Sequence, residues 1–158
     1  MNKIKAILFT LLMFLAGVVI SFFTEGNYRQ LIQDFFKLFK GDKITFFGKG
    51  FYFGNYTFVT AAGIYFAFIF LVLYKQSFRT IASRLLLAVV SFFVAAAITS
   101  FIDSTIKLAN HDPLESEVLA LNFNAIDYNL HLMIDLGLSL LTVGIAWIRT
   151  RRSEKSTN

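Results

Sequence analysis

Two aspartates, Asp103 and Asp127, stand at the facing ends of the last two apolar segments of the chain. Asp103 closes the run Leu85–Ile102, and Asp127 opens the run that ends at Ile148. The connection between them, residues 104–126, is short enough that we expect both carboxylates at the same membrane face. Two close carboxylates can share one proton, as an aspartic hydrolase requires. The same pattern would also arise from two helix-end carboxylates that only mark the boundary between membrane and water.

Polar side chains accompany both aspartates. These neighbours are Thr99, Ser100, Asn122 and Asn124. In a dyad of this type one carboxyl group is ionised, the other is protonated, and the two titrate as a coupled pair. The ionised group would take a proton from a water that attacks a carbonyl carbon. The protonated group would donate to the developing oxyanion or to the leaving amine.

A stripe of ionisable groups follows in the last apolar segment. Asp127, His131 and Asp135 are spaced by four residues, so they share one helix face, and Asp135 would lie about 12 Å deeper than Asp127. A carboxylate at that depth must face the bundle interior and find a partner. We expect an interhelical hydrogen-bond network there. A proton relay and a metal site remain open, but one helix stripe cannot chelate an ion without ligands from elsewhere. Replacement of His131 by Ala is expected to be tolerated.

The amino-acid composition of the chain indicates which kind of secondary structure positions these side chains. The chain has 158 residues, of which 56% are hydrophobic and 20 are Phe, too apolar for an ordinary soluble domain. Four stretches lack Lys, Arg and Glu over a length that can span a bilayer. They are Ala6–Phe23, Tyr56–Tyr74, Leu85–Ile102 and Tyr128–Ile148. We therefore predict an all-α integral membrane protein, a single domain of residues 1–158 with four transmembrane helices and outer loops 24–55 and 103–127.

The distribution of charge predicts the topology. Basic residues cluster near both termini and between the second and third spans, which four spans place on one side of the membrane. The positive-inside rule makes that side cytoplasmic, so we expect both termini inside. The first outer loop is an exception, because it carries five basic residues and three acidic ones. We expect some of these charges to lie at the membrane interface.

The first outer loop reads as two elements. Tyr28, Leu31, Ile32, Phe35 and Phe39 follow helical spacing, which predicts a short helix lying on the membrane surface. The aromatic runs 43–47 and 51–55 flank a Gly-rich tip and predict a small β-hairpin. The second outer loop is polar, and we expect it to be ordered only in part. Asn122 or Asn124 is expected to cap the fourth helix.

Several short motifs of this chain resemble, in order and spacing, the motifs of one protein family. Phe123-Asn124-Ala125-Ile126-Asp127 is similar to a Phe-Asn-x-Ala-Asp motif, and Thr99-Ser100-Phe101-Ile102-Asp103 stands where that family has Gly-Asn-x-x-Asp. Glu25-Gly-Asn-Tyr-Arg29 corresponds to Asp-x-x-x-Lys, and Asn55-Tyr-Thr57 to Asn-x-Gly. Together with size, four spans and internal termini, the chain resembles the bacterial lipoprotein signal peptidases (type II, aspartic), as a diverged member or paralogue. It departs from them in lacking the Gly-Asn pair and the Gly of Asn-x-Gly, and its segment from Asn55 to Lys75 is short.

The resemblance implies an aspartic endopeptidase of the bacterial inner membrane that cleaves signal peptides of lipid-modified prolipoproteins. It implies a precursor peptide and membrane lipids as partners, and a monomer without metal, cofactor or nucleic acid. The catalytic residues would be Asp103 and Asp127. The residues expected to support or contact the substrate are Asn124, Asn55, Ser100, Glu25 and Arg29. Glu25 and Arg29 could equally be an ordinary i,i+4 ion pair, and Asn55 a turn residue.

Two other classes of function remain open. One is a non-catalytic four-helix membrane protein, either an accessory subunit or a degenerate peptidase relative that binds lipidated peptide. The other is a small ion-coupled transporter that uses Asp127, His131 and Asp135. A transporter requires Asp135 to line a path toward the cytoplasmic side, whereas a peptidase requires the two carboxyl groups within reach of one water.

Overall fold

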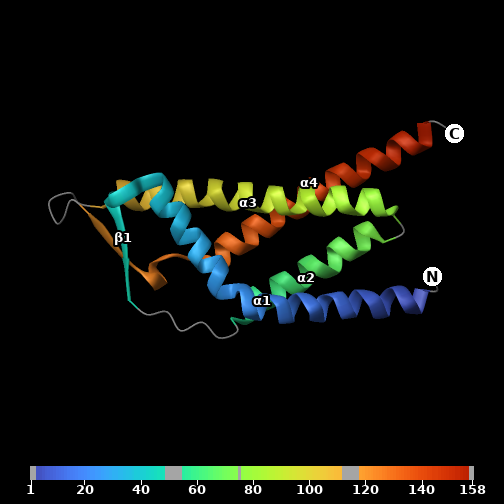
Figure 1. Cartoon of the computed structure of the whole chain (residues 1–158), viewed down its shortest axis with the longest axis horizontal. Helices are drawn as coiled ribbons and strands as arrows, with labels where there is room; N and C mark the ends of the chain where they lie inside the picture. Colours follow the sequence, from blue (N-terminus) through green and yellow to red (C-terminus); the bar gives the residue numbers. More distant parts are fainter. Residues whose placement is uncertain (1–2, 49–54, 75, 112–117, 157–158) are drawn as a thin grey trace.

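Four long helices form the molecule. The computed structural model describes residues 3–48, 55–74, 76–111 and 118–156, with side chains up to residue 150. The helices are α1 (Lys3–Lys40), α2 (Tyr56–Leu73), α3 (Phe78–Ala109) and α4 (Tyr128–Ser156). All four are long and apolar enough to cross a membrane. They run along the length of the molecule, and α1 begins at the end where α4 finishes (Figure 1). The predicted four-helix architecture is thus confirmed, with a small sheet added.

Side-chain caps fix where three helices begin. Asn55 Oδ1 accepts from the Thr57 N–H at 3.0 Å, which starts α2. Ser77 Oγ accepts from the Thr80 N–H and starts α3. Asp127 Oδ1 accepts from the Leu130 N–H at 3.0 Å and starts α4. The expectation that Asn122 or Asn124 caps α4 is wrong. Asn122 instead caps a short 3-10 turn, Phe123–Ala125, that leads to Asp127.

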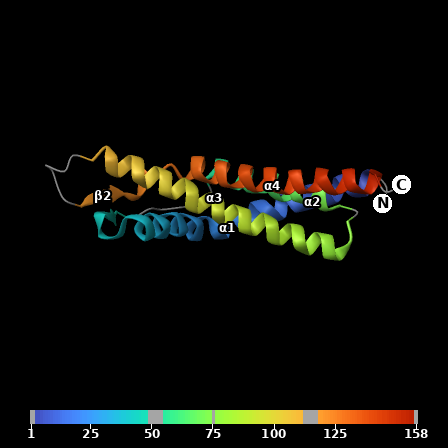
Figure 2. The same ribbon diagram turned by 90° about the horizontal axis from the view of Figure 1, so that it is seen from above.

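Three helices are longer than their predicted spans, and α4 runs to Ser156, past the predicted end at Ile148. The predicted surface helix is the second part of α1, which continues to Lys40 and changes direction on the way (Figure 1). Tyr28, Ile32 and Phe36 are buried at helical spacing, so packing holds this part as helix. Helix α3 continues to Ala109 and crosses its neighbours obliquely (Figure 2). Asp103 therefore lies within a helix and not at its end, because hydropathy marks only the part of a helix that fits the bilayer.

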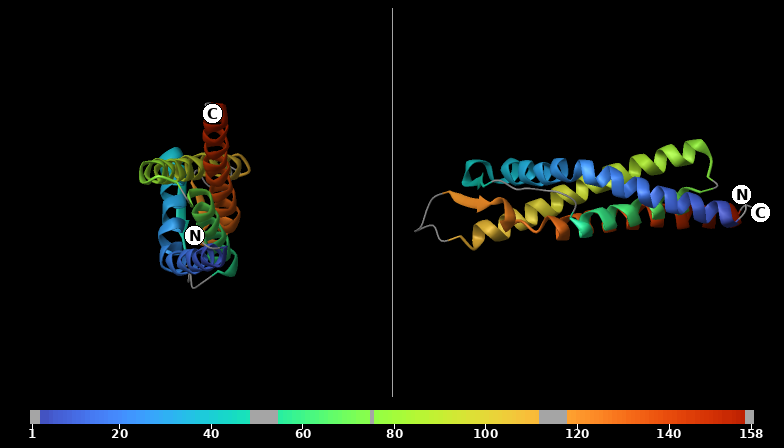
Figure 3. Two further views of the ribbon diagram at one scale, coloured as in Figure 1. Left: turned by 90° about the vertical axis from the view of Figure 1, so that its right-hand side faces the viewer. Right: turned by 90° about the horizontal axis from the view of Figure 1, so that it is seen from below.

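The sheet differs from the predicted hairpin. Strand β1 (Ile44–Phe47) pairs in parallel with β2 (Leu119–Asn122), in a register that opposes Ile44 to Leu119. The predicted partner, 51–55, lies outside the described residues except for Asn55, which caps α2. Part of the second outer loop is thus a strand, and the sheet ties the two outer connections together. The right-hand view of Figure 3 shows β2 (orange) at the end of the bundle away from the start of α1, and Figure 1 shows β1 at the same end.

The core is divided between the two ends of the bundle. Near the sheet it includes Ile32, Phe36, Leu121, Tyr128 and Leu132, and a second cluster lies around Ile69 and Val143. Helix α1 packs closely on α2, and α3 on α4. The outward helix faces carry many exposed Leu, Ile, Val and Phe side chains. That pattern is typical of a surface that faces lipid.

Candidate functional site

A polar cleft lies beside the sheet, where the outer connections meet α1 and α4. Its volume is about 420 Å³. Four of the predicted site residues line it, from three segments of the chain: Arg29, Asn55, and the pair Asn124 and Asp127. The remaining lining residues are Ala125, Ile126, Tyr128 and Asn129. Parts of three of the motifs that suggested a peptidase thus meet at this cleft, whereas Asp103, Ser100 and Glu25 are not among its lining residues.

Asp127 is exposed at the first turn of α4. Its Oδ1 accepts from the Leu130 N–H, and its carbonyl oxygen accepts from the His131 N–H at 3.1 Å. A carboxylate at a helix N-terminus is favoured by the helix dipole. The bond to Leu130 fixes the side chain through Oδ1, and the residue is exposed and lines the cleft, so a substrate or a water can reach it.

Asp103 reaches α4 through a histidine. Its Oδ2 lies 3.1 Å from His131 Nε2, and its Oδ1 lies 3.6 Å from the Lys107 ammonium. Lys107 also donates to the Ala125 carbonyl at 2.8 Å, next to the segment that carries Asp127. Each oxygen of Asp103 is therefore held by a different basic side chain. His131 and Lys107 connect Asp103 to the Asp127 segment from two directions.

Glu25 and Arg29 form a buried pair beneath the cleft. Arg29 donates to Glu25 Oε1 from Nε at 3.1 Å and from Nη2 at 2.6 Å. Glu25 Oε2 accepts from the Asn55 N–H at 3.4 Å, and the Arg29 guanidinium lies 4.7 Å from the centre of the Tyr128 ring. The pair is more than an exposed i,i+4 contact, because it joins α1 to the starts of α2 and α4. The role of the pair in supporting a substrate site, which the family resemblance implied, stays a prediction.

Three buried polar atoms have no hydrogen-bond partner in the described part of the chain: Ser100 Oγ, Asn129 Oδ1 and His131 Nδ1. Each lies within four residues of Asp103 or Asp127. Unsatisfied buried polar atoms are rare, and they are often explained by a catalytic role or a ligand. Their occurrence beside both aspartates therefore marks this end of α3 and α4 as the candidate site.

Deeper in the bundle, Asp135 is fully buried and well satisfied. Its Oδ2 accepts from the Tyr28 hydroxyl at 2.7 Å, and its Oδ1 accepts from the Thr99 hydroxyl at 3.0 Å. One turn further along α4, Ser139 donates to the Ala88 carbonyl at 2.8 Å. These bonds form the interhelical network that the α4 stripe predicted. No group of three or more His, Cys, Asp or Glu side chains within the described ranges is arranged to hold a metal ion.

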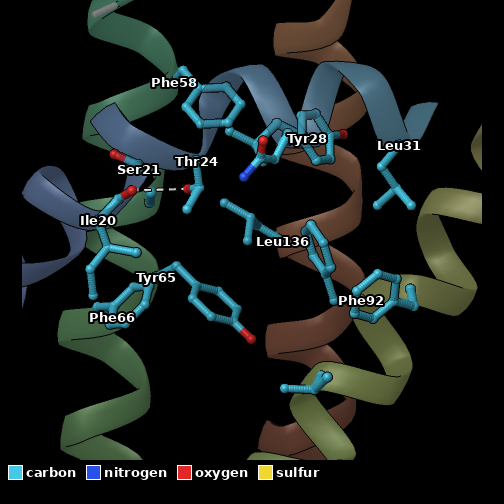
Figure 4. Close-up of a pocket in the computed structure, with 15 residues that line it drawn as sticks. Ile20, Ser21, Thr24, Tyr28, Leu31, Phe58, Tyr65, Phe66, Phe92 and Leu136 are labelled. Carbon is cyan, nitrogen blue, oxygen red and sulfur yellow. Dashed lines mark hydrogen bonds between the residues drawn. The ribbon is translucent and has the colours of Figure 1, made fainter. Parts of the chain in front are cut away.

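An apolar cavity of about 500 Å³ lies between the helices below the cleft (Figure 4). Phe58, Tyr65, Phe66, Phe92 and Leu136 surround it, and Tyr28 lies at its upper edge. Its exposed rim includes Ile20, Val89 and Phe93, so apolar side chains continue from the cavity to the outer face of the bundle. A cavity of this size and lining suits an apolar ligand group.

Sequence reasoning missed Lys107, Tyr128 and Asn129. Lys107 stands four residues after Asp103, and this i,i+4 pattern could have identified the ion pair. Tyr128 and Asn129 follow Asp127 directly, but only the fold brings Arg29 onto the Tyr128 ring. No protein-family model matches this chain, and neither a curated protein nor a solved structure is similar to it.

Proposed function

We propose that this chain is a membrane aspartic endopeptidase that cleaves signal peptides of lipid-modified prolipoproteins. The observation that carries the proposal is the polar cleft, which collects Arg29 of α1, Asn55 at the start of α2, and Asn124 and Asp127 of the segment before α4. These are positions at which the sequence resembles the lipoprotein signal peptidases. Asp103 contacts His131 of α4 and Lys107, and Lys107 in turn donates to the Ala125 carbonyl in the segment that carries Asp127.

The apolar cavity supports a lipid-modified substrate. It shares α1 with the polar cleft, since Tyr28 lines the cavity and Arg29 lines the cleft. A precursor could place its apolar part among the Phe side chains and its scissile peptide bond at the cleft. The aromatic side chains that are exposed at this end of the molecule, Phe39 of α1 and Phe47 of β1, would contact the lipidated end.

The proposed reaction uses the two carboxyl groups in opposite protonation states. One carboxylate takes a proton from water as the water oxygen bonds to the scissile carbonyl carbon. The other carboxyl group gives its proton to the leaving amine nitrogen as the carbon–nitrogen bond breaks. Asn124 would hold the peptide in position, and the unpaired atoms Ser100 Oγ and Asn129 Oδ1 offer further hydrogen bonds.

The test is cleavage of a diacylglyceryl-modified precursor peptide by the purified full chain, read by mass. Asp103→Asn and Asp127→Asn should each lower the cleavage rate by about 100-fold or more, since each removes an acid–base group. Thermal unfolding should stay close to that of the wild type. Asp34→Asn is the matched control, because Asp34 is an exposed acid on α1 whose hydrogen bond is to Gln30. Cleavage retained in either dyad variant would remove the proposal.

We also propose that the chain lies in the bacterial inner membrane with both termini in the cytoplasm. The start of α1 and the end of α4 share one end of the bundle, and the sheet lies at the other (Figure 1). The chain has no native cysteine, so single cysteines can report sidedness. A membrane-impermeant thiol reagent should label Thr45→Cys in intact cells and Lys3→Cys only after permeabilisation. The reverse result would invert the topology.

A further inference from the structure

Outside the proposed dyad, His131 is the residue whose contacts connect the two aspartates. Its main-chain N–H donates to the Asp127 carbonyl at 3.1 Å, and its ring Nε2 lies 3.1 Å from Asp103 Oδ2. One residue therefore links the first turn of α4 to the last two turns of α3. A change in the position of its ring would move the Asp103 carboxylate relative to the start of α4.

The ring of His131 is held on several sides. Its side chain is 6% exposed, and the Phe36 ring from α1 lies with its centre 6.2 Å away. Phe36 itself is fully buried against the sheet end of the core. Three helices thus contribute to the placement of this ring: α1 by packing, α3 through Asp103, and α4 through its main chain.

The other ring nitrogen supports a role beyond helix packing. His131 Nδ1 is buried and has no hydrogen-bond partner within the described residues. A histidine that served only to join helices would be expected to satisfy both nitrogens, because an unpaired buried polar atom costs about 1–3 kcal/mol. A carboxylate on one imidazole nitrogen commonly fixes the orientation and tautomer of the ring.

From these contacts we propose that His131 is a positioning residue for Asp103 in the peptidase reaction. The inference rests on the proposed function. His131 holds Oδ2 of Asp103 while Lys107 holds Oδ1, so the carboxylate keeps one orientation for the proposed reaction. This assignment replaces the expectation that His131 is dispensable.

The experiment compares substitutions that imitate one ring nitrogen each. The amide nitrogen of Gln can occupy the place of Nε2, whereas that of Asn reaches only the place of Nδ1. His131→Ala and His131→Asn should lower kcat for the lipopeptide by about ten- to a hundred-fold, since a small misplacement of a reacting group costs that much. His131→Gln should restore most of the rate. KM should change by no more than about two-fold in all three, because substrate binding is not altered.

His131→Ala with unchanged kcat, or Asn rescuing as well as Gln, would overturn the proposal. His111→Gln is the matched control, because His111 is the other histidine of the chain and lies beyond the end of α3. It should cleave at the wild-type rate.

A second measurement does not depend on activity. In the full chain with isotope-labelled histidine, Asp103→Asn should shift the imidazole resonances of His131 and leave those of His111 unchanged. Absence of that shift would also overturn the proposal. If the wild type cleaves no lipopeptide but the shift occurs, the proposed function fails while the Asp103–His131 contact stands.

Discussion

Hydroxyl donors from two other helices satisfy the deepest acid of the bundle, Asp135. Tyr28 and Thr99 each donate to one of its oxygens, so a carboxyl group that would be costly inside a membrane has partners on both sides. The sequence predicted that Asp135 faces inward, because of its spacing from Asp127. It could not predict Tyr28 as a partner, because 107 residues separate the two and only the packing of α1 on α4 joins them.

The Tyr28–Asp135 bond should contribute to stability and not to peptide cleavage. Tyr28→Phe and Asp135→Asn should each lower the free energy of unfolding by about 1 kcal/mol, the size usual for an interhelical hydrogen bond in a membrane protein. The double variant should lose less than the sum of the two, because both remove one interaction. Unfolding in mixed micelles measures this.

The same variants distinguish a peptidase from an ion-coupled transporter. A peptidase with its chemistry at the cleft should keep most of its cleavage rate in Tyr28→Phe. A cleavage rate lost in Tyr28→Phe without loss of fold would place Asp135 in the reaction and favour a relay along α4.

At the scale of elements, α1 and α2 approach closely at two glycines. A Cβ on Gly17 would lie 2.9 Å from the Ala62 carbonyl oxygen and 3.0 Å from Gly63 Cα. Since both neighbours are main-chain atoms, they cannot rotate out of the way as a side chain would. Small residues at such positions allow two membrane helices to pack backbone to backbone.

Gly17→Leu should therefore lower the free energy of unfolding by about 1–3 kcal/mol, the usual cost of overpacking. Gly137→Ala is the control, because nothing lies within 4 Å of a Cβ placed on Gly137. It should leave stability unchanged or raise it by up to about 1 kcal/mol, since Ala favours helix over Gly. Equal effects of the two substitutions would contradict the close α1–α2 contact. Thermal unfolding of both variants in one detergent measures the difference.

Helix existence was predictable from the sequence, while helix ends and strand pairing were not. Runs of apolar residues located all four helices, and Tyr56 was the correct start of α2. Helices α1 and α3 extend past their apolar runs because packing and capping continue where hydropathy falls. The Gly-rich segment after Phe47 favoured a hairpin, in which β1 would pair with the segment that follows it directly. The observed partner, β2, comes after α2 and α3 in the chain, and no sequence feature near β1 indicates this pairing.

At the scale of the whole molecule, the parallel sheet fixes the outer connections to one another. Thr45 and Ala120 are opposite each other in the register and both are exposed. Because the chain has no native cysteine, the pair Thr45→Cys and Ala120→Cys can form only the intended disulfide within one chain. We expect rapid oxidation and retained cleavage, since the sheet does not move in the proposed reaction. Electrophoresis without reductant measures the cross-link.

The off-register pair Thr45→Cys and Asn122→Cys is the control for that cross-link. Asn122 is opposite Phe47, two residues further along the register. The added distance along the strand places the two Cα atoms more than about 7 Å apart, beyond the reach of a disulfide. Cross-linking of this pair as fast as the in-register pair would refute the pairing of β1 with β2.

The pairing of β1 with β2 has a consequence for biosynthesis. A ribosome makes β1 shortly after α1, but β2 only after α2 and α3 are complete, so β1 has no partner while residues 48–118 are made. Asp127 emerges a few residues after β2, and α4 follows it. The cleft is therefore incomplete until the last part of the chain is made, and no chain that stops before α4 could contain the complete candidate site.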